Sequence, residues 1–223
     1  MSDTSFTYAV ARVRSKELGL LSSQNLEQLL SAKSYEECLR LLQDKGWGSA
    51  DSGLIAEEML AQEREKTWAL MRELVDDMHL FDVFLYTNDY HNLKAAIKLV
   101  CTQGEDFGLF ISNGSIPYQR ILEAVREKEY GWLPSGMAQA AQEGYTTLSQ
   151  TQDGQLCDVI VDRACLDTIY QAGKDSRSDL IQLYAELTVA SADIKTAVRC
   201  ANTGKPLDFI QRALAPCDTL SVS

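Results

Sequence analysis

The chain has 223 residues, of which 45% are hydrophobic, and this composition is ordinary for a folded globular protein and argues against a disordered one. Its net charge of −11 repels nucleic-acid phosphates and anionic lipid headgroups, so we expect no nucleic acid among its partners and no bilayer-binding surface. No stretch approaches the ~18 consecutive apolar residues of a direct membrane span, and the first residues lack the basic and apolar regions of a signal peptide, so we expect a cytoplasmic protein.

The first elements in chain order are predicted to be helices, because Ala, Leu, Glu, Gln and Asp dominate and only four prolines occur. Residues 6–15 carry apolar side chains at helical spacing. Ser22 or Ser23 is expected to cap a second helix. Ser34 and Glu37 have the spacing of a capping box, in which each residue binds the other's amide, and they predict the start of a third helix.

A long helical pattern follows the glycine that ends the third helix, Gly46. Asp51 or Ser52 is expected to open it. A break near residues 76–77 is interpreted as a helix junction, where Asp77 or a neighbour caps the next turn. Another helix is predicted from about residue 80 to residue 102.

The second half of the chain again predicts helices. One starts at Ile116–Pro117, because proline suits a first helical position. Ser135 is expected to cap a short helix over residues 137–142 that stops before Gly144.

The last part of the chain predicts two longer helices and a tail. The first covers residues 156–171 and ends at Gly173. Caps at residues 175–178 begin the second, which Gly204 stops, and residues after it form a short helix and a tail.

One heptapeptide recurs along the chain. Asn92–Lys98 returns in conservatively altered form as Asp193–Arg199, an offset of 193 − 92 = 101 residues, and each copy closes a long helical pattern. Repetition of this size is typical of one structural unit used more than once. We therefore predict an all-α fold of duplicated, pseudo-symmetric multi-helix units, with a first unit over 1–104, a second over 105–204, and a third unit or a tail starting at 205–223.

The repeated motif allows two interpretations of its basic residues. Lys94 and Lys98 share a helical face, as do Lys195 and Arg199, and these rows could face a partner's carboxylates. The alternative is that they only complement the negative end of the helix dipole. In that case the apolar members of the motif define the core: Leu93, Ile97, Ile194 and Val198.

The first residue of each copy of the motif is polar. Asn92 and Asp193 could be buried and could bond to neighbouring helix ends, which would explain polar residues at equivalent places.

No catalytic, cofactor-binding or metal-binding residues are predicted. His79 and His91 lack the spacing of metal ligands, and neither a Walker loop, a nucleophile elbow nor a dinucleotide fingerprint is present. The six cysteines contain no Cys-x-x-Cys pair, and we expect free thiols that act as small core residues: Cys38, Cys101, Cys157, Cys165, Cys200 and Cys217.

The N-terminal residues and the repeated motif resemble a known family. Tyr8–Arg14, followed by two leucines, is similar to the start of the C subunit of the V/A-type ATPases (ATP synthases), whose eukaryotic counterpart is the V-ATPase d subunit. Asn92–Lys94 and its echo Asp193–Lys195 are similar to the recurring motif of that family. The step Gly114–Ile116 after the first copy resembles it too.

The resemblance implies a non-catalytic central-stalk (rotor) protein. In the family three similar helical units form a funnel that sits on the membrane proteolipid ring and receives the shaft made with the D and F subunits, for ATP-driven proton or sodium transport or for ATP synthesis. The chain would supply two of the three funnel units, so apolar surface meant for a third would be exposed and would invite self-association. The candidates for partner contact are Arg12, Arg14, Lys94, Lys98, Lys195 and Arg199.

Two other classes of function stay open on the residues alone. One is a general helical-repeat adaptor that binds another cytoplasmic protein. The other is a helical enzyme with a site that the sequence does not reveal.

Overall fold

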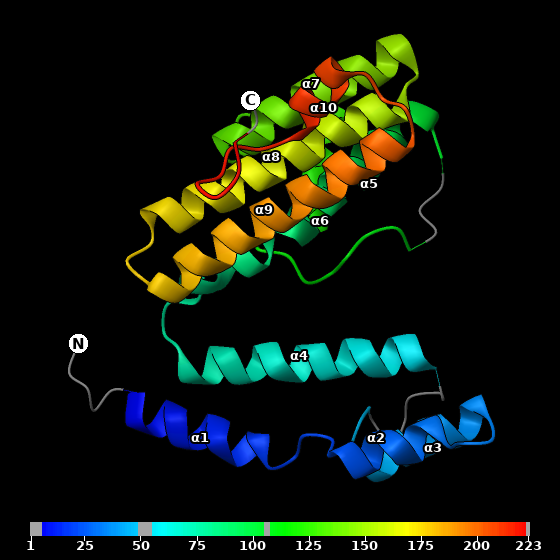
Figure 1. The fold of residues 1–223 in the computed structure, drawn as a ribbon, viewed down its shortest axis with the longest axis vertical. Helices are drawn as coiled ribbons and strands as arrows, with labels where there is room; N and C mark the ends of the chain where they lie inside the picture. Colours follow the sequence, from blue (N-terminus) through cyan, green and yellow to red (C-terminus); the bar gives the residue numbers. More distant parts are fainter. Residues whose placement is uncertain (1–5, 49–54, 105–107, 222–223) are drawn as a thin grey trace. The chain divides into compact units, whose positions relative to one another are not determined.

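The computed structural model describes residues 6–48, 55–104 and 108–221, and their regular structure is all helical, as predicted (Figure 1). The chain divides into two compact units, Met1–His79 and Leu80–Ser223. These compact units do not coincide with the predicted repeat units, whose boundaries at 104 and 204 stay a prediction. Each compact unit is described by itself below.

The first compact unit contains four α-helices: α1 (Thr7–Glu17), α2 (Ser23–Leu30), α3 (Tyr35–Asp44) and α4 (Ala56–Leu74). Polar contacts join α1 to α4, since the Tyr8 hydroxyl donates to Glu73 at 3.1 Å. The turn after α3 is also fixed to α4, where Lys66 donates to the carbonyl oxygens of Gly46 and Gly48, each at 3.0 Å. Gly46 has φ +85°, which favours glycine at this helix end.

The helix starts of this unit follow the predicted capping chemistry in part. Ser22 caps α2, and Ser22 and Asn25 form the reciprocal capping box. The box predicted at Ser34 and Glu37 is wrong in one half, because Ser34 does accept the Glu37 amide but the Glu37 carboxylate accepts the amide of Lys33 at 2.7 Å. The cap predicted at residue 51 or 52 lies outside the described residues.

The junction after α4 is confirmed, with one difference. Asp77 accepts the amide of His79 at 3.1 Å and so caps the next turn. The single helix predicted over 80–102 is instead a 3-10 helix, η2 (Met78–Phe84), followed by α5 (Tyr86–Thr102).

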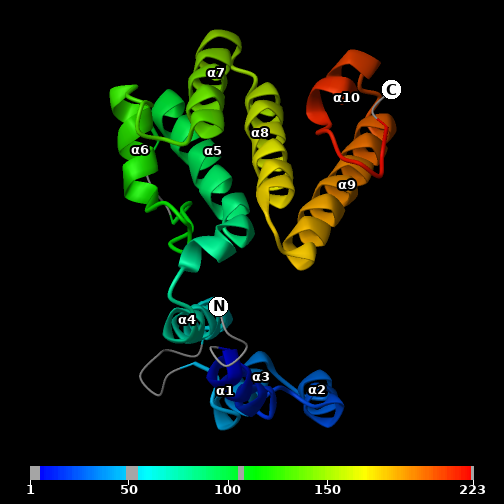
Figure 2. The same cartoon turned by 90° about the vertical axis from the view of Figure 1, so that its left-hand side faces the viewer.

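The second compact unit contains α5 and five further helices: α6 (Tyr118–Glu127), α7 (Ser135–Thr151), α8 (Gly154–Asp175), α9 (Asp179–Asn202) and α10 (Leu207–Ala213). Helix α8 lies between α7 and α9, and α5 packs against α6, α7 and α8 (Figure 2). The short α10 contacts α8 and α9. This arrangement makes α8 the central helix of the unit.

Two glycines that were expected to end helices lie inside them. Helix α7 continues through Gly144 to residue 151, and α8 continues through Gly173 to residue 175. Both are buried where helices come close. A Cβ on Gly144 would lie 3.2 Å from Ile97, and a Cβ on Gly173 would lie 2.4 Å from that of Ala185. Close helix packing, not helix termination, explains both residues.

The helix bounds are consistent with duplication at the offset of 101 residues. Helix α8 ends at residue 175, and 175 − 101 = 74 is the last residue of α4. Helix α9 begins at residue 179, and 179 − 101 = 78 is the first residue of η2.

The apolar residues of the repeated motif differ in burial. Leu93 and Ile97 are fully buried in the core of the second unit, as predicted. Ile194 and Val198, predicted to define the core at the equivalent places, are 54% and 56% exposed, so that prediction is wrong. The reason is that α7 and α8 pack on α5, whereas the described helices of the second unit that contact α9, α8 and α10, leave Ile194 and Val198 more than half exposed.

Candidate functional site

The polar residue that opens the first copy of the motif holds a returning stretch of backbone. Residues 108–116, here called the first return segment, run back along α5 (Figure 1). The side chain of Asn92 is fully buried, donates to the Ile111 carbonyl oxygen at 2.9 Å and accepts the Ile111 amide at 2.8 Å. The prediction that Asn92 is buried is confirmed, although its partner is the return segment and not a helix end.

A second buried side chain of α5 binds the same segment. Asp89 accepts the Ser115 hydroxyl at 2.6 Å and the amides of Ser115 and Ile116 at 3.3 and 3.2 Å. Burial raises the pKa of Asp89, and these three hydrogen bonds oppose the rise. A Cβ on Gly114 would lie 2.2 Å from the Asp89 carboxylate, so a glycine is required beside this anchor.

The second copy of the motif repeats this arrangement. Residues 214–221, the second return segment, run back along α9, since Ala215 binds Asp193 and the later residues Asp218 and Thr219 bind Glu186, nearer the start of the helix. Asp193 is 3% exposed, and its Oδ1 accepts the Ala215 amide at 3.1 Å, which confirms its predicted burial. Its Oδ2 has no hydrogen-bond partner among the described residues. Burial raises the pKa of Asp193.

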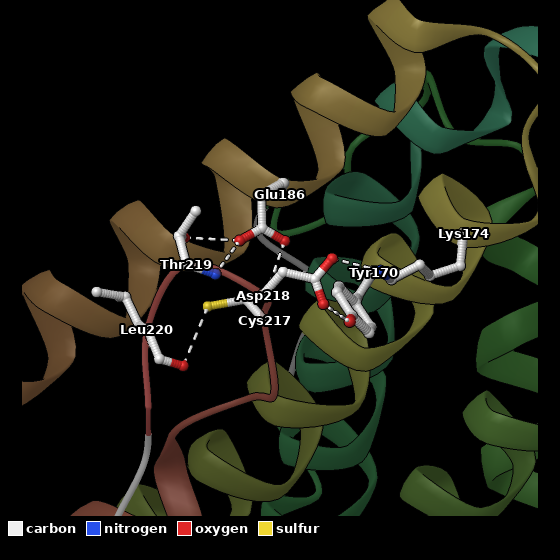
Figure 3. A network of polar contacts seen from close by, with 7 residues as sticks. All are labelled: Tyr170, Lys174, Glu186, Cys217, Asp218, Thr219 and Leu220. Carbon is white, nitrogen blue, oxygen red and sulfur yellow. Dashed lines mark hydrogen bonds and ion pairs between the residues drawn. The ribbon is translucent and has the colours of Figure 1, made fainter.

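A polar network fixes the end of the second return segment to α8 and α9 (Figure 3). Glu186 of α9 accepts the amides of Asp218 and Thr219 at 3.1 and 2.8 Å. Asp218 in turn accepts from Tyr170 at 2.8 Å and pairs with Lys174, both on α8. The hydrogen bonds from Lys174 and Tyr170 lower the pKa of Asp218.

Two of the six predicted contact residues are engaged inside the second unit. Lys94 and Lys98 of α5 form ion pairs with Asp162 and Asp158 of α8, each at 2.6 Å. The basic row of the first motif therefore joins two helices of the same chain.

The other four predicted contact residues fall into two groups. Arg12 pairs with Glu73 at 3.3 Å, and Arg14 pairs with Glu17 at 2.7 Å, both at exposed places in the first unit. Lys195 and Arg199 are exposed on α9 and form no ion pair with any residue that the structure describes.

An apolar stripe runs along the exposed side of α9. Its members recur at helical spacing, and each is more than half exposed: Leu180, Leu183, Leu187, Ile194 and Val198. Lys195 and Arg199 directly follow the last two members in sequence and flank the stripe. Exposed apolar surface was expected from the family resemblance, but its place on α9 was not predicted.

An open groove of about 900 Å³ lies in the second unit, where α8 meets the start of α7 and α10. Charged side chains of both signs line it, including Glu143, Arg163, Asp167 and Arg212. Asp175 lines it too, so acidic side chains slightly outnumber basic ones in the groove.

Two buried thiols of the second unit lie in surroundings that disfavour the thiolate. Burial raises the pKa of Cys157 to about 11 and that of Cys165 to about 12, so both thiols are protonated and weakly nucleophilic at neutral pH. Among the described residues, no three His, Cys, Asp or Glu side chains are grouped so that they could hold a metal ion. No helix formed by those residues is long and apolar enough to cross a membrane.

Sequence reasoning missed two anchors, Asp89 and Glu186. Asp89 lies three residues before Asn92, on the same face of α5, so helical spacing from a polar residue suspected to be buried could have found it. Glu186 lies seven residues, or two turns, before Asp193 and gives the same signal.

The comparisons with known proteins agree on one family. The family described as ATP synthase (C/AC39) subunit matches residues 9–223. The C subunit of the V-type sodium ATPase of Enterococcus hirae is 24% identical over 159 residues, which cover 69% of this chain and 48% of the relative. The C subunit of the A-type ATP synthase of Methanocaldococcus jannaschii is 25% identical over 192 residues, which cover 76% of this chain and 48% of the relative. The chain thus spans about half the length of the curated relatives it matches.

Proposed function

The chain belongs to the ATP synthase (C/AC39) subunit family, and on that premise we propose that it is a non-catalytic central-stalk subunit of a V/A-type rotary ATPase. In this role it couples a shaft made with the D and F subunits to the proteolipid ring. The coupled process is proton or sodium transport driven by ATP, or ATP synthesis driven by the ion. The observation that carries the proposal is the family match over residues 9–223.

The hydrogen bonds that hold the return segments along the helices of the second unit support a mechanical role. A coupling subunit must pass torque without deforming, and return segments bonded along helices resist sliding of one element past another. Asn92 and Asp89 supply five hydrogen bonds to the first return segment, two from Asn92 and three from Asp89. Buried hydrogen bonds of this kind are costly to break, because each leaves a polar group without water.

The protein would work at the cytoplasmic face of the membrane. It reaches the membrane through its partners in the complex.

Co-purification tests the proposal directly. The tagged chain, expressed in its source cell, is expected to bring down the D and F subunits and the proteolipid from detergent extracts. An adaptor of another system would retain a different partner, and capture of neither shaft nor ring would overturn the proposal.

Charge reversal tests whether Lys94 and Lys98 contact a partner. Lys94→Glu with Lys98→Glu is expected to weaken binding to shaft or ring and to leave the helicity unchanged. Because both lysines also pair with α8, the matched control adds Asp158→Lys and Asp162→Lys, which restores those pairs in swapped form. Loss of binding that the swap does not rescue assigns the lysines to the partner, whereas rescue assigns them to the α5–α8 contact.

A further inference from the structure

The two return segments are held by different kinds of side chain. The first is bound by Asn92 and Asp89, which are both fully buried. In the second copy of the motif Asp193 takes the place of Asn92, but the residue at the place of Asp89 is Ala190, since 89 + 101 = 190. Alanine has no polar side chain, so the second return segment lacks the buried acid that anchors the first. Glu186, one turn before Ala190, binds it instead.

The Glu186 anchor lies at a place that water reaches. Its carboxylate accepts the amides of Asp218 and Thr219 at 3.1 and 2.8 Å and the Thr219 hydroxyl at 2.6 Å (Figure 3). The neighbouring ion pair joins Lys174 and Asp218, whose side chains are 46% and 62% exposed. Exposed polar contacts of this kind exchange for water at little cost, so this end of the segment can detach.

The buried anchor of the second return segment is incomplete. Asn92 both donates to and accepts from Ile111, whereas Asp193 accepts one amide and its Oδ2 has no hydrogen-bond partner among the described residues. The charged side chains that act on this carboxylate are Arg163 and Asp167 of α8, which have opposite signs and pair with each other. A buried charge with so little compensation favours states in which water reaches it.

We propose that the second return segment opens and closes locally while α8 and α9 stay packed, with the Asp193 carboxylate favouring the open state and the contacts of Glu186 and Lys174 favouring the closed one. Opening lets water reach Asp193 and uncovers Ala215, which is fully buried, and Cys217, which packs against the core of the second unit. The first return segment stays closed, because both of its anchors are buried and hydrogen-bonded. The device does not depend on the rotor role.

The closed state should be most stable at an intermediate pH. Partial burial raises the pKa of Glu186, but hydrogen bonds from the segment outweigh it and hold this pKa below the ordinary value, and the hydrogen bond from Lys174 lowers the pKa of Asp218. These two contributions are lost as pH falls through the lowered pKa values. Burial raises the pKa of Asp193, so its contribution is lost as pH rises through the raised value. Closure should therefore be strongest near the ordinary carboxyl pKa of about 4.

Alkylation of the full chain with N-ethylmaleimide at pH 7 tests the local opening. Cys217 reports the opening and the fully buried Cys157 reports global unfolding, and mass spectrometry measures both labelling rates in one sample. Cys217 should label faster than Cys157, and its rate should depend little on urea, because a local opening exposes little surface.

Two variants should shift the rate at Cys217 in opposite directions. Glu186→Ala removes three hydrogen bonds to the segment and is expected to raise the rate about tenfold. Asp193→Asn removes the buried charge and is expected to lower it about fivefold. Glu123→Ala, at an exposed place on α6, is the matched control and should leave the rate unchanged. A urea dependence of Cys217 equal to that of Cys157, or a failure of the two variants to act in opposite directions, would overturn the proposal.

Hydrogen exchange provides the second measurement. The free energy of opening, taken from the Asp218 and Thr219 amides between about pH 3 and pH 8, should pass through a maximum, and Asp193→Asn should remove the fall on its alkaline side. The Ile111 amide of the first return segment should need a larger opening free energy throughout. Equal values for the two segments, or a free energy of opening without a maximum, would contradict the local device.

Discussion

Asn92 and Asp193 perform the same task with different side chains, and the difference has an energetic consequence. The amide of Asn92 both donates to and accepts from one backbone residue. The carboxylate of Asp193 can only accept, so one of its oxygens is buried without a partner in the described part of the chain. An unsatisfied buried polar atom costs about 1–3 kcal/mol.

We predict that Asp193→Asn stabilises the second unit by about 1 kcal/mol at pH 7, because burying a neutral amide costs less than burying a carboxylate whose second oxygen has no partner. The pKa of Asp193 is raised in the folded state, so the folded chain binds the proton more tightly than the unfolded chain. The free energy of unfolding therefore falls as pH rises from the ordinary carboxyl pKa through the raised one. Hydrogen exchange of the α9 amides at several pH values measures both effects.

The control for this prediction is Asp89, which has a raised pKa of its own and contributes a slope of the same sign. Asp193→Asn should reduce the pH dependence of the free energy of unfolding and leave the part of it that Asp89 contributes. An identical pH dependence in the variant and the natural chain would show that the Asp193 pKa is not raised.

We predict that Gly114→Ala destabilises the first return segment by about 1–3 kcal/mol, because the added Cβ would lie 2.2 Å from the Asp89 carboxylate. Asp89 cannot move aside without losing its hydrogen bonds to Ser115 and Ile116. The measurement is hydrogen exchange of the Ser115 and Ile116 amides. Gly131→Ala is the matched control, since nothing lies within 4 Å of its Cβ, and equal effects of the two variants would contradict the argument.

At the scale of the helix, glycine acts in two opposed ways. Inside a helix it costs about 1 kcal/mol relative to alanine, which would favour replacement. At Gly173, however, α8 and α9 approach so closely that an alanine Cβ would lie 2.4 Å from that of Ala185. Overpacking of this kind costs about 1–3 kcal/mol, so the contact is expected to outweigh the helix propensity.

We therefore predict that Gly173→Ala lowers the stability of the second unit by about 1–2 kcal/mol, despite its better helix propensity. Gly154→Ala at the start of the same helix has no atom within 4 Å and should be neutral or slightly stabilising. Urea unfolding measures the free energy of unfolding of both variants, and hydrogen exchange of the α8 amides shows whether the change lies in this helix. A gain in stability at residue 173 would mean that the two helices separate freely.

The same glycines explain what the sequence could and could not predict about the elements. Apolar periodicity and caps predicted where helices lie, and Ser22 and Asp77 cap as expected. A glycine ends a helix when its backbone turns left-handed and continues a helix when a neighbour needs the space. Gly204, with φ +65°, is of the first kind, and Gly144 and Gly173 are of the second. Only the tertiary contact separates them.

The roles of the motif residues in the candidate site could also be predicted only in part. The offset of 101 residues predicted that equivalent residues would have equivalent roles, and the burial of Asn92 and Asp193 follows that rule. Ile194 breaks it, because burial depends on a covering element that a local pattern does not encode. The ion pairs of Lys94 and Lys98 were missed for the same reason.

At the scale of the whole molecule, the two compact units differ in how much core they hold. Among the described residues of the first unit, the buried hydrophobic side chains are Leu39 and Met59. The second unit buries a continuous cluster that draws on η2, on α5 to α9 and on the second return segment. A fully buried side chain of this size contributes about 1.5–3 kcal/mol, so two such side chains offset little of the entropy of ordering four helices.

We predict that the isolated chain opens in two steps. The amide hydrogens of the first unit should exchange through openings with a free energy of about 1–2 kcal/mol. Those of the core helices of the second unit should need openings whose free energy is several kcal/mol larger. Native-state hydrogen exchange over a urea series measures both in one sample. The amides of α5 and α8 should keep their protection at urea concentrations where those of α1 to α4 have lost it. A single denaturant dependence shared by all helices would mean that the first unit draws its stability from a core larger than Leu39 and Met59 supply.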